Sequence, residues 1–110
     1  MYCIRATYLP REGMFFDAEH YERHHIPLTK SLLAGRVNYV RIGAEFNVTL
    51  QLDSTVVRSP CVFHLYVQTL EEVEAFRRFR LSADVQPLRE DLPRYTNCVN
   101  EWTVSRFVEG

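Results

Sequence analysis

The sequence predicts an α+β domain of the ferredoxin-like type, a four-stranded antiparallel sheet with helices on one face. Segments that alternate with the period of two expected of strands are interrupted by segments with helical spacing, in the order strand, helix, strand, strand, helix, strand. The 110 residues, 46% hydrophobic and 25% charged, suffice for one domain with its own core. We therefore expect residues 1–110 to form a single domain.

The chain is expected to begin with a strand over residues 2–9, followed by a turn and a long helix. Asp17 can accept hydrogen bonds from the N–H groups of the first helical turn, and Phe16 and Tyr21 have the spacing of a hydrophobic staple. Pro27 lacks an N–H and disfavours helical geometry in the residue before it. The sequence therefore predicts a break or kink at this proline before the helix resumes.

The middle of the chain is expected to contain two strands, residues 36–46 and 61–68. The first is rich in β-branched and aromatic residues, and the second carries apolar or aromatic side chains on both faces. The segment between them, residues 47–60, alternates in part and then breaks its pattern. It can form a short extra hairpin, a lid over a pocket, or an edge that pairs with a partner chain.

A capping box is expected to start the next helix, in which Thr69 accepts from the Glu72 amide and the Glu72 side chain reaches back. Asp84 is expected to cap a short last helix that Pro93 ends, and residues 96–108 form the last strand. One layer of helices covers only one face of this sheet. Because both strand faces carry apolar or aromatic residues, we expect the sheets of two protomers to pack together as a homodimer.

Charge and cysteine content argue against several classes of protein. The formal net charge of −1 does not point to nucleic acid or an anionic membrane. No stretch resembles a signal peptide, and none reaches the roughly 18 apolar residues of a membrane span. Cys3, Cys61 and Cys98 form no Cys-x-x-Cys pair, so we expect reduced, buried thiols within strands, with a catalytic Cys61 as the alternative. A cytoplasmic protein is expected.

Three segments, taken in order, resemble a known family. They are Phe16-Asp17-x-x-x-Tyr21-x-x-x-His25-x-Pro27-Leu28, Phe63-His64-Leu65-Tyr66-Val67 followed by Thr69-Leu70-Glu71, and Asp91-Leu92-Pro93-Arg94-Tyr95-Thr96-Asn97. Together they resemble the EthD family, small dimeric α+β barrel proteins named for a role in ethyl tert-butyl ether degradation. The resemblance implies the same dimeric barrel and favours a functional role for His25, although most of that family has no assigned reaction.

His25 is the first candidate for chemistry. A neutral imidazole can take a proton from a carbon next to a carbonyl, and a protonated one can hold a carboxylate, in both cases without a cofactor. The alternative is a core histidine that bonds an Asp or the backbone. Tyr39 is expected to face the cavity as a second catalytic group that orients a substrate oxygen. Tyr21 either donates to a substrate oxygen or only completes the staple.

His64, Tyr95 and Asn97 complete the expected substrate-binding set. His64 faces either the cavity or the dimer seam, depending on strand register. Tyr95 and Asn97 belong to the closing motif, where asparagine also has structural uses in turns. No metal is expected at His20 and His24, because the HExxH pattern and a suitably spaced acidic residue are absent from the sequence around them. No motif asks for haem, flavin or a phosphate group, so no cofactor is expected.

The expected function is that of a small cofactor-independent enzyme acting on a hydrophobic, oxygenated small molecule such as a lactone, quinone or polyketide-like aromatic. The expected chemistry is proton transfer, as in an isomerase, cyclase or dehydratase. One alternative is a ligand-binding accessory protein of a degradation pathway that does not turn its ligand over. Another is a cofactor-free oxygenase, in which a substrate carbanion reduces oxygen.

Overall fold

The computed structural model describes all 110 residues as a four-stranded antiparallel sheet with strand order β2-β3-β1-β4. The strands are β1 (Tyr2–Tyr8), β2 (Arg41–Leu50), β3 (Asp53–Val67) and β4 (Asn100–Arg106). The helices are α1 (Ala18–His20), α2 (Ile26–Leu33), α3 (Leu70–Leu81) and α4 (Gln86–Tyr95). A π-helical turn, Tyr21–His25, joins α1 to α2, and a 3₁₀ turn, Ala83–Val85, precedes α4. The predicted ferredoxin-like α+β fold is confirmed.

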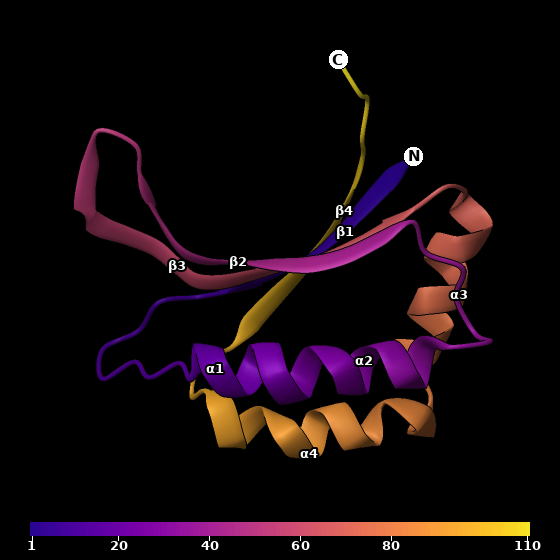
Figure 1. The fold of residues 1–110 in the computed structure, drawn as a ribbon, viewed down its shortest axis with the longest axis horizontal. Helices are drawn as coiled ribbons and strands as arrows, with labels where there is room; N and C mark the ends of the chain where they lie inside the picture. Colours follow the sequence, from indigo (N-terminus) through magenta and orange to yellow (C-terminus); the bar gives the residue numbers. More distant parts are fainter.

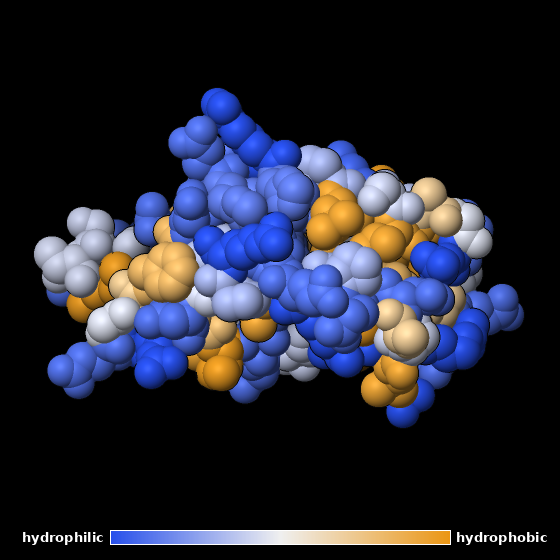
Figure 2. Space-filling model, turned by 90° about the horizontal axis from the view of Figure 1, so that it is seen from below, coloured by the Kyte–Doolittle hydropathy of each residue, from blue (hydrophilic) through white to orange (hydrophobic).

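The helices lie on one side of the sheet (Figure 1). One continuous helical segment, made of α1, the π turn and α2, runs alongside α4. Helix α3 lies at one end of the molecule. The core lies between these helices and the sheet, where Ile4, Ala6 and Tyr8 of β1 are buried with Phe63 and Leu65 of β3. The surface on the helical side is mainly hydrophilic, with its apolar residues in separate groups (Figure 2).

The opposite face of the sheet has no helix over it (Figure 1). It is less apolar than the sequence suggested. Val62 and Tyr66 point to it, but so do Arg5 and His64, which pair with each other across β1 and β3. His64 also bonds the Glu45 carboxylate of β2. The expectation of two apolar faces is therefore corrected to one apolar face and one mixed face.

The first helix starts as predicted but does not break at Pro27. The Asp17 side chain accepts from the His20 amide at 3.0 Å, and the rings of Phe16 and Tyr21 lie 5.4 Å apart as the staple requires. Ahead of Pro27, the chain widens into the π turn, in which the Ile26 amide donates to the Tyr21 carbonyl. This wider turn makes room for the Pro27 ring, which would clash with a carbonyl of the preceding turn in a regular α-helix.

Residues 47–60 form a hairpin, the first of the three interpretations. They extend β2 and β3 beyond the rest of the sheet, and the hairpin curls toward the side without helices (Figure 1). The pairing slips twice near Thr49, and Leu52 at the tip is 96% exposed. β2 starts at Arg41, later than the sequence suggested.

The ends of α3 and α4 differ from the expected caps. Thr69 accepts from the Glu72 amide at 3.3 Å, but the Glu72 carboxylate accepts from the Asn38 amide instead of reaching back. Ser82, not Asp84, caps the 3₁₀ turn: its hydroxyl accepts from the Asp84 amide.

Pro93 does not end α4, which continues to Tyr95, and β4 starts only at Asn100. As a result Cys98 lies in the loop between them rather than in a strand.

A membrane span requires both a certain length and a certain hydropathy of a helix, and no helix of this chain meets both conditions.

Candidate active site

A cavity of about 430 Å³ lies between the helices and the sheet. Its wall is mainly apolar, with ten hydrophobic residues among the 15 that line it. The aromatic residues that line it are Tyr8, Tyr21, Phe63, Phe76, Phe79, Tyr95 and Trp102. The polar residues of other types are His25, Thr29, Arg80, Arg89 and Asn100. A concave apolar site with a few polar groups is the usual form of a small-molecule site, and the volume falls in the usual range of about 300–1,000 Å³.

His25 lines one part of this wall and is paired with Asp91, which does not itself line the cavity. His25 is 7% exposed and Asp91, from α4, is 3% exposed. The Nδ1 atom of His25 lies 2.9 Å from Oδ2 of Asp91. Because a carboxylate only accepts, this contact places the proton of a neutral His25 on Nδ1 and leaves the lone pair of Nε2 free.

The π turn explains how one carboxylate reaches two histidines. His20 Nε2 lies 2.9 Å from Asp91 Oδ1, while His25 bonds the other oxygen. Residues five apart in an α-helix point about 140° away from each other. The i→i+5 hydrogen bonding of the π turn brings His20 and His25 to the same side, toward α4.

Three tyrosines lie around His25, and one of them, Tyr95, brings its hydroxyl to Nε2. The Tyr95 hydroxyl lies 3.5 Å from His25 Nε2 and 2.6 Å from the Tyr8 hydroxyl. The Tyr21 ring stacks against the His25 ring, with centroids 4.9 Å apart and planes 23° apart. His25 is thus held by Asp91 at Nδ1 and contacted by the rings of Tyr21 and Tyr95, with the Tyr95 hydroxyl beside Nε2.

Burial sets the protonation states of this cluster. Burial lowers the pKa of His25, against the opposing effect of Asp91, and so favours the neutral imidazole. Burial acts to raise the pKa of Asp91, but hydrogen bonds from His20 and His25 outweigh it and the pKa is lowered. Burial also raises the pKa of Tyr8 and Tyr95, which therefore keep their protons and can donate. The site thus combines a neutral base with neutral hydrogen-bond donors.

Two arginines form another part of the wall. The Arg80 guanidinium lies 4.0 Å from the centroid of the Trp102 ring. Burial and the neighbouring charge of Arg89 lower the pKa of Arg80. Arg89 in turn donates to the Arg80 carbonyl at 2.9 Å.

Several solved structures are similar to nearly the whole chain. No family model and no curated protein matches it. An EthD-like protein from Ralstonia eutropha has a TM-score of 0.74 at 16% identity, covering 94% of this chain and 88% of that one. An EthD family protein from Bacillus halodurans has a TM-score of 0.64 at 14% identity, covering 98% and 99%. This chain has the EthD-like fold. SnoaB, a cofactor-independent oxygenase from Streptomyces nogalater, has a TM-score of 0.50 at 15% identity, covering 99% and 92%.

The EthD-like fold brings three of the expected site residues together. His25, Tyr21 and Tyr95 line the cavity. Tyr21 also makes the predicted staple with Phe16. Tyr39 does not line the cavity: it lies before β2, half-buried against the core, because the segment after α2 is not yet a strand. The expectation that Tyr39 faces the cavity is therefore corrected.

His64 and Asn97 also lie outside the cavity wall. His64 points to the face of the sheet without helices, where it bonds Glu45. Asn97 fastens the loop before α1: its side chain accepts from the Phe15 amide at 3.0 Å and donates to the Gly13 carbonyl at 2.9 Å. Its side-chain bonds therefore hold this loop, and the expectation that Asn97 belongs to the cavity wall is corrected.

Several residues of the site were not assigned a role from the sequence. Asp91 precedes Tyr95 by four residues, so their placement on one helical face was available as a signal. Tyr8, Asn100 and Trp102 lie on the strands, and only tertiary structure shows that they face the cavity. Cys61 is not a candidate nucleophile, because burial raises the pKa of its thiol to about 12.

Proposed function

We propose that this protein is a small cofactor-independent enzyme that moves a proton on a hydrophobic, oxygenated small molecule, with His25 as the acid and base. The observation that carries the proposal is the arrangement of His25: Asp91 holds Nδ1 at 2.9 Å, and Nε2 faces the hydroxyl of Tyr95 beside an apolar cavity. A base oriented by a buried carboxylate and aimed at a small-molecule site is the arrangement that general acid–base catalysis needs.

The proposed reaction is a proton transfer next to a carbonyl. Nε2 of His25 takes the proton from the carbon, and the electron pair of the broken C–H bond moves to the carbonyl oxygen as an enolate. The Tyr95 hydroxyl donates to that oxygen while its charge develops, and it accepts in turn from the Tyr8 hydroxyl 2.6 Å away. His25 then returns the proton to another carbon or to a leaving oxygen, which gives isomerisation or dehydration. Asp91 stabilises the imidazolium formed between the two steps.

The composition of the cavity wall supports the proposed substrate class. Seven aromatic residues face a space that fits a small ring system, and the arginines and Asn100 offer hydrogen-bond donors to its oxygens. Lactones, quinones and polyketide-like aromatics combine an apolar body with carbonyl oxygens. These compounds therefore remain the substrates that we propose.

The test begins with ligand binding and ends with exchange at carbon. A panel of lactones, quinones and hydroxylated aromatics is screened by thermal unfolding; a ligand at about 100 times its Kd adds roughly 2.7 kcal/mol, about ten degrees for a chain of this size. Each hit is then incubated in D₂O and followed by NMR. Wild type should catalyse deuterium uptake next to the carbonyl.

The matched variants are His25→Asn and His64→Ala. In His25→Asn, the new side-chain amide can still donate to Asp91 in place of Nδ1 but offers no base at the Nε2 position. His25→Asn should therefore bind the hit and lose exchange, whereas His64→Ala, on the far face of the sheet, should keep both. Exchange that survives in His25→Asn would show that another group is the base. Binding without exchange in wild type would instead favour the accessory ligand-binding protein.

A cofactor-free oxygenase is the second candidate. SnoaB is a cofactor-independent oxygenase with this fold. In the oxygenase that we propose as the alternative, the substrate carbanion that His25 generates reduces oxygen. An oxygen electrode separates the two functions. Oxygen uptake that depends on a hit and on His25 would identify an oxygenase, while turnover that is unchanged under nitrogen would identify the isomerase or dehydratase.

We also propose that the protein works as a homodimer in the cytoplasm. The mixed face of the sheet has no helix over it (Figure 1) and presents the half-buried Tyr66, whose ring centroid lies 5.3 Å from that of Phe107. A second copy of this face is the proposed cover. The three cysteines are free and buried, which suits a reducing compartment.

A further inference from the structure

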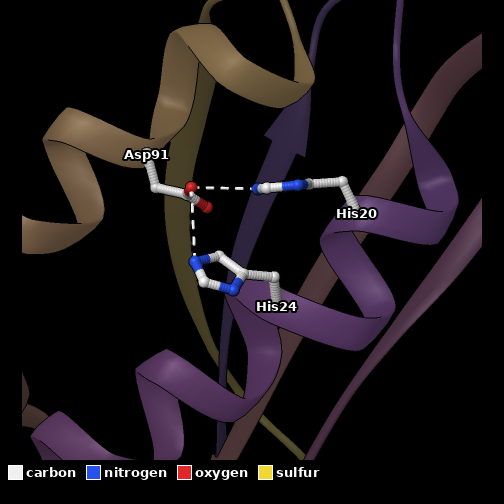
Figure 3. Close-up of side chains that lie close together, drawn as sticks. All are labelled: His20, His24 and Asp91. Carbon is white, nitrogen blue, oxygen red and sulfur yellow. Dashed lines mark hydrogen bonds and ion pairs between the residues drawn. The ribbon is translucent and has the colours of Figure 1, made fainter.

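Asp91 has a second oxygen that the proposed proton transfer does not use. Oδ1 points away from His25 and lies 2.9 Å from His20 Nε2 and 3.8 Å from His24 Nε2. These three atoms all lie within 4.8 Å of one another. Figure 3 shows His20 and His24 extending from one helix toward Asp91 on the neighbouring helix. None of the three residues lines the cavity.

We propose that His20, His24 and Asp91 bind a divalent transition-metal ion, of which Zn²⁺ fits best. A tetrahedral zinc with bonds of about 2.0–2.2 Å keeps its ligand atoms roughly 3.3–3.6 Å apart. The observed 2.9 and 3.8 Å separations of the histidine nitrogens from Oδ1 lie on either side of this range. To seat the ion, His20 has to move away from Oδ1 and His24 toward it, with the two histidine nitrogens, now within 4.8 Å of each other, brought to the same range.

The ligand types decide the class of metal. Two imidazole nitrogens and one carboxylate suit Zn²⁺ and its transition-metal neighbours, whereas Mg²⁺ and Ca²⁺ prefer sites made of oxygens. Three protein ligands leave at least one coordination position for water or a ligand. That position opens to solvent, because the His24 side chain is 55% exposed and that of His20 is 25% exposed.

The surrounding structure holds the ligands in place. Asp91 is buried, and His25 fixes its other oxygen, as outer groups commonly orient a metal-bound carboxylate. The His20 ring is stacked with the Tyr95 ring, with planes 19° apart, and lies 4.9 Å from the His24 ring. The sequence argued against a metal because no acidic residue is suitably spaced from these histidines in the chain. The fold supplies that residue from α4.

An ion on Oδ1 leaves the bond between Oδ2 and His25 in place. It would, however, draw negative charge from the carboxylate that orients His25. The metal site would therefore be linked to the cavity through Asp91 without entering it. Metal binding itself does not depend on the proposed reaction, so the two proposals can be tested apart.

The test is a calorimetric titration of metal-free protein with ZnCl₂, with Co²⁺ absorption spectra as a second readout. Wild type should bind one Zn²⁺ per chain, and millimolar Mg²⁺ should not compete. His24→Ala removes an exposed ligand outside the cavity. It should weaken Zn²⁺ binding at least about tenfold, since losing even an outer-shell partner costs about 10–100-fold. His64→Ala, which removes a histidine from the other face, should leave the Kd unchanged.

Two further measurements make the outcome decisive. Zn²⁺ should shift the NMR signals of the His20 and His24 rings and not those of His64, and circular dichroism should show that each variant is folded. Absence of binding at millimolar Zn²⁺ would overturn the proposal. So would a Kd that His24→Ala does not change, or an affinity that falls equally with His64→Ala.

Discussion

Replacing Asp91 with asparagine tests whether this carboxylate organises the site. The substitution keeps the size of the side chain and removes its charge. In the wild type, the buried carboxylate accepts from His20 and from His25, each at 2.9 Å. A hydrogen bond to a charged group contributes about 1.5–3 kcal/mol. An asparagine has a single acceptor oxygen and can keep only one of these bonds as it is. We therefore expect Asp91→Asn to lower the free energy of unfolding by about 1.5–3 kcal/mol.

The measurement is urea unfolding with EDTA present, so that bound metal adds no stability. With an m value of about 1–3 kcal/mol/M, the midpoint should fall by roughly 1 M. The matched control is Glu19→Gln, which removes the exposed carboxylate paired with Arg23 at 3.3 Å and should lower the free energy of unfolding far less.

A second readout follows the proton on His25. If the amide nitrogen of the substituted asparagine faces Nδ1 of His25, that atom must accept, and the proton moves to Nε2. Nitrogen NMR should then show the opposite tautomer, and any activity that uses Nε2 as a base should be lost. A stability change below about 0.5 kcal/mol with an unchanged tautomer would refute the role assigned to Asp91.

Three further predictions concern other parts of the molecule. Tyr8→Phe and Tyr95→Phe should each lower the free energy of unfolding by about 1–3 kcal/mol, because each leaves a buried hydroxyl with fewer partners. Urea unfolding of the single and double variants should show a coupling of at least about 0.5 kcal/mol between the two positions. Additive losses of stability would contradict the 2.6 Å hydrogen bond. Because burial raises the pKa of Cys61 to about 12 from 9.0, the unfolded chain loses its thiol proton first. Stability measured by denaturation should therefore fall as pH rises from about 9 toward 12, and less steeply in Cys61→Ala; an equal slope would count against the buried thiol. Light scattering should give the mass of two chains for wild type and of one chain for Tyr66→Glu, and a wild-type monomer would exclude the proposed dimer.

The parts of this fold that follow from local chemistry could be predicted from the sequence. Asp17 and Thr69 begin their helices because a side-chain oxygen can satisfy an amide three residues on, whatever the rest of the chain does. The order of strands and helices follows from periodicity in the same way. The three motifs that resemble the EthD family predicted the fold more specifically than periodicity alone, and the solved structures agree with that fold.

The composition of the site could be predicted only in part, because it depends on groups from distant segments. Regular α-helical spacing places His25 far around the helix from His20, and only the π turn ahead of Pro27 brings both to one carboxylate. The expectation for Tyr39 failed because the chain enters β2 two residues later, at Arg41. Strand register, helix register and loop geometry are set by packing across the whole domain, so single positions within a segment are the least predictable.

The two proposals meet at one carboxylate, yet the structure offers variants that separate them. His24 approaches only the outward oxygen of Asp91 and lines no cavity, so removing it should affect the metal and leave the substrate site intact. Tyr95 contacts His25 and the cavity without offering a metal ligand, so Tyr95→Phe should affect turnover and leave Zn²⁺ affinity unchanged. If each variant changed both properties, the oxygens of Asp91 would not act independently. If each changed only its own, a metal that alters turnover in the wild type would have to act through the charge of Asp91.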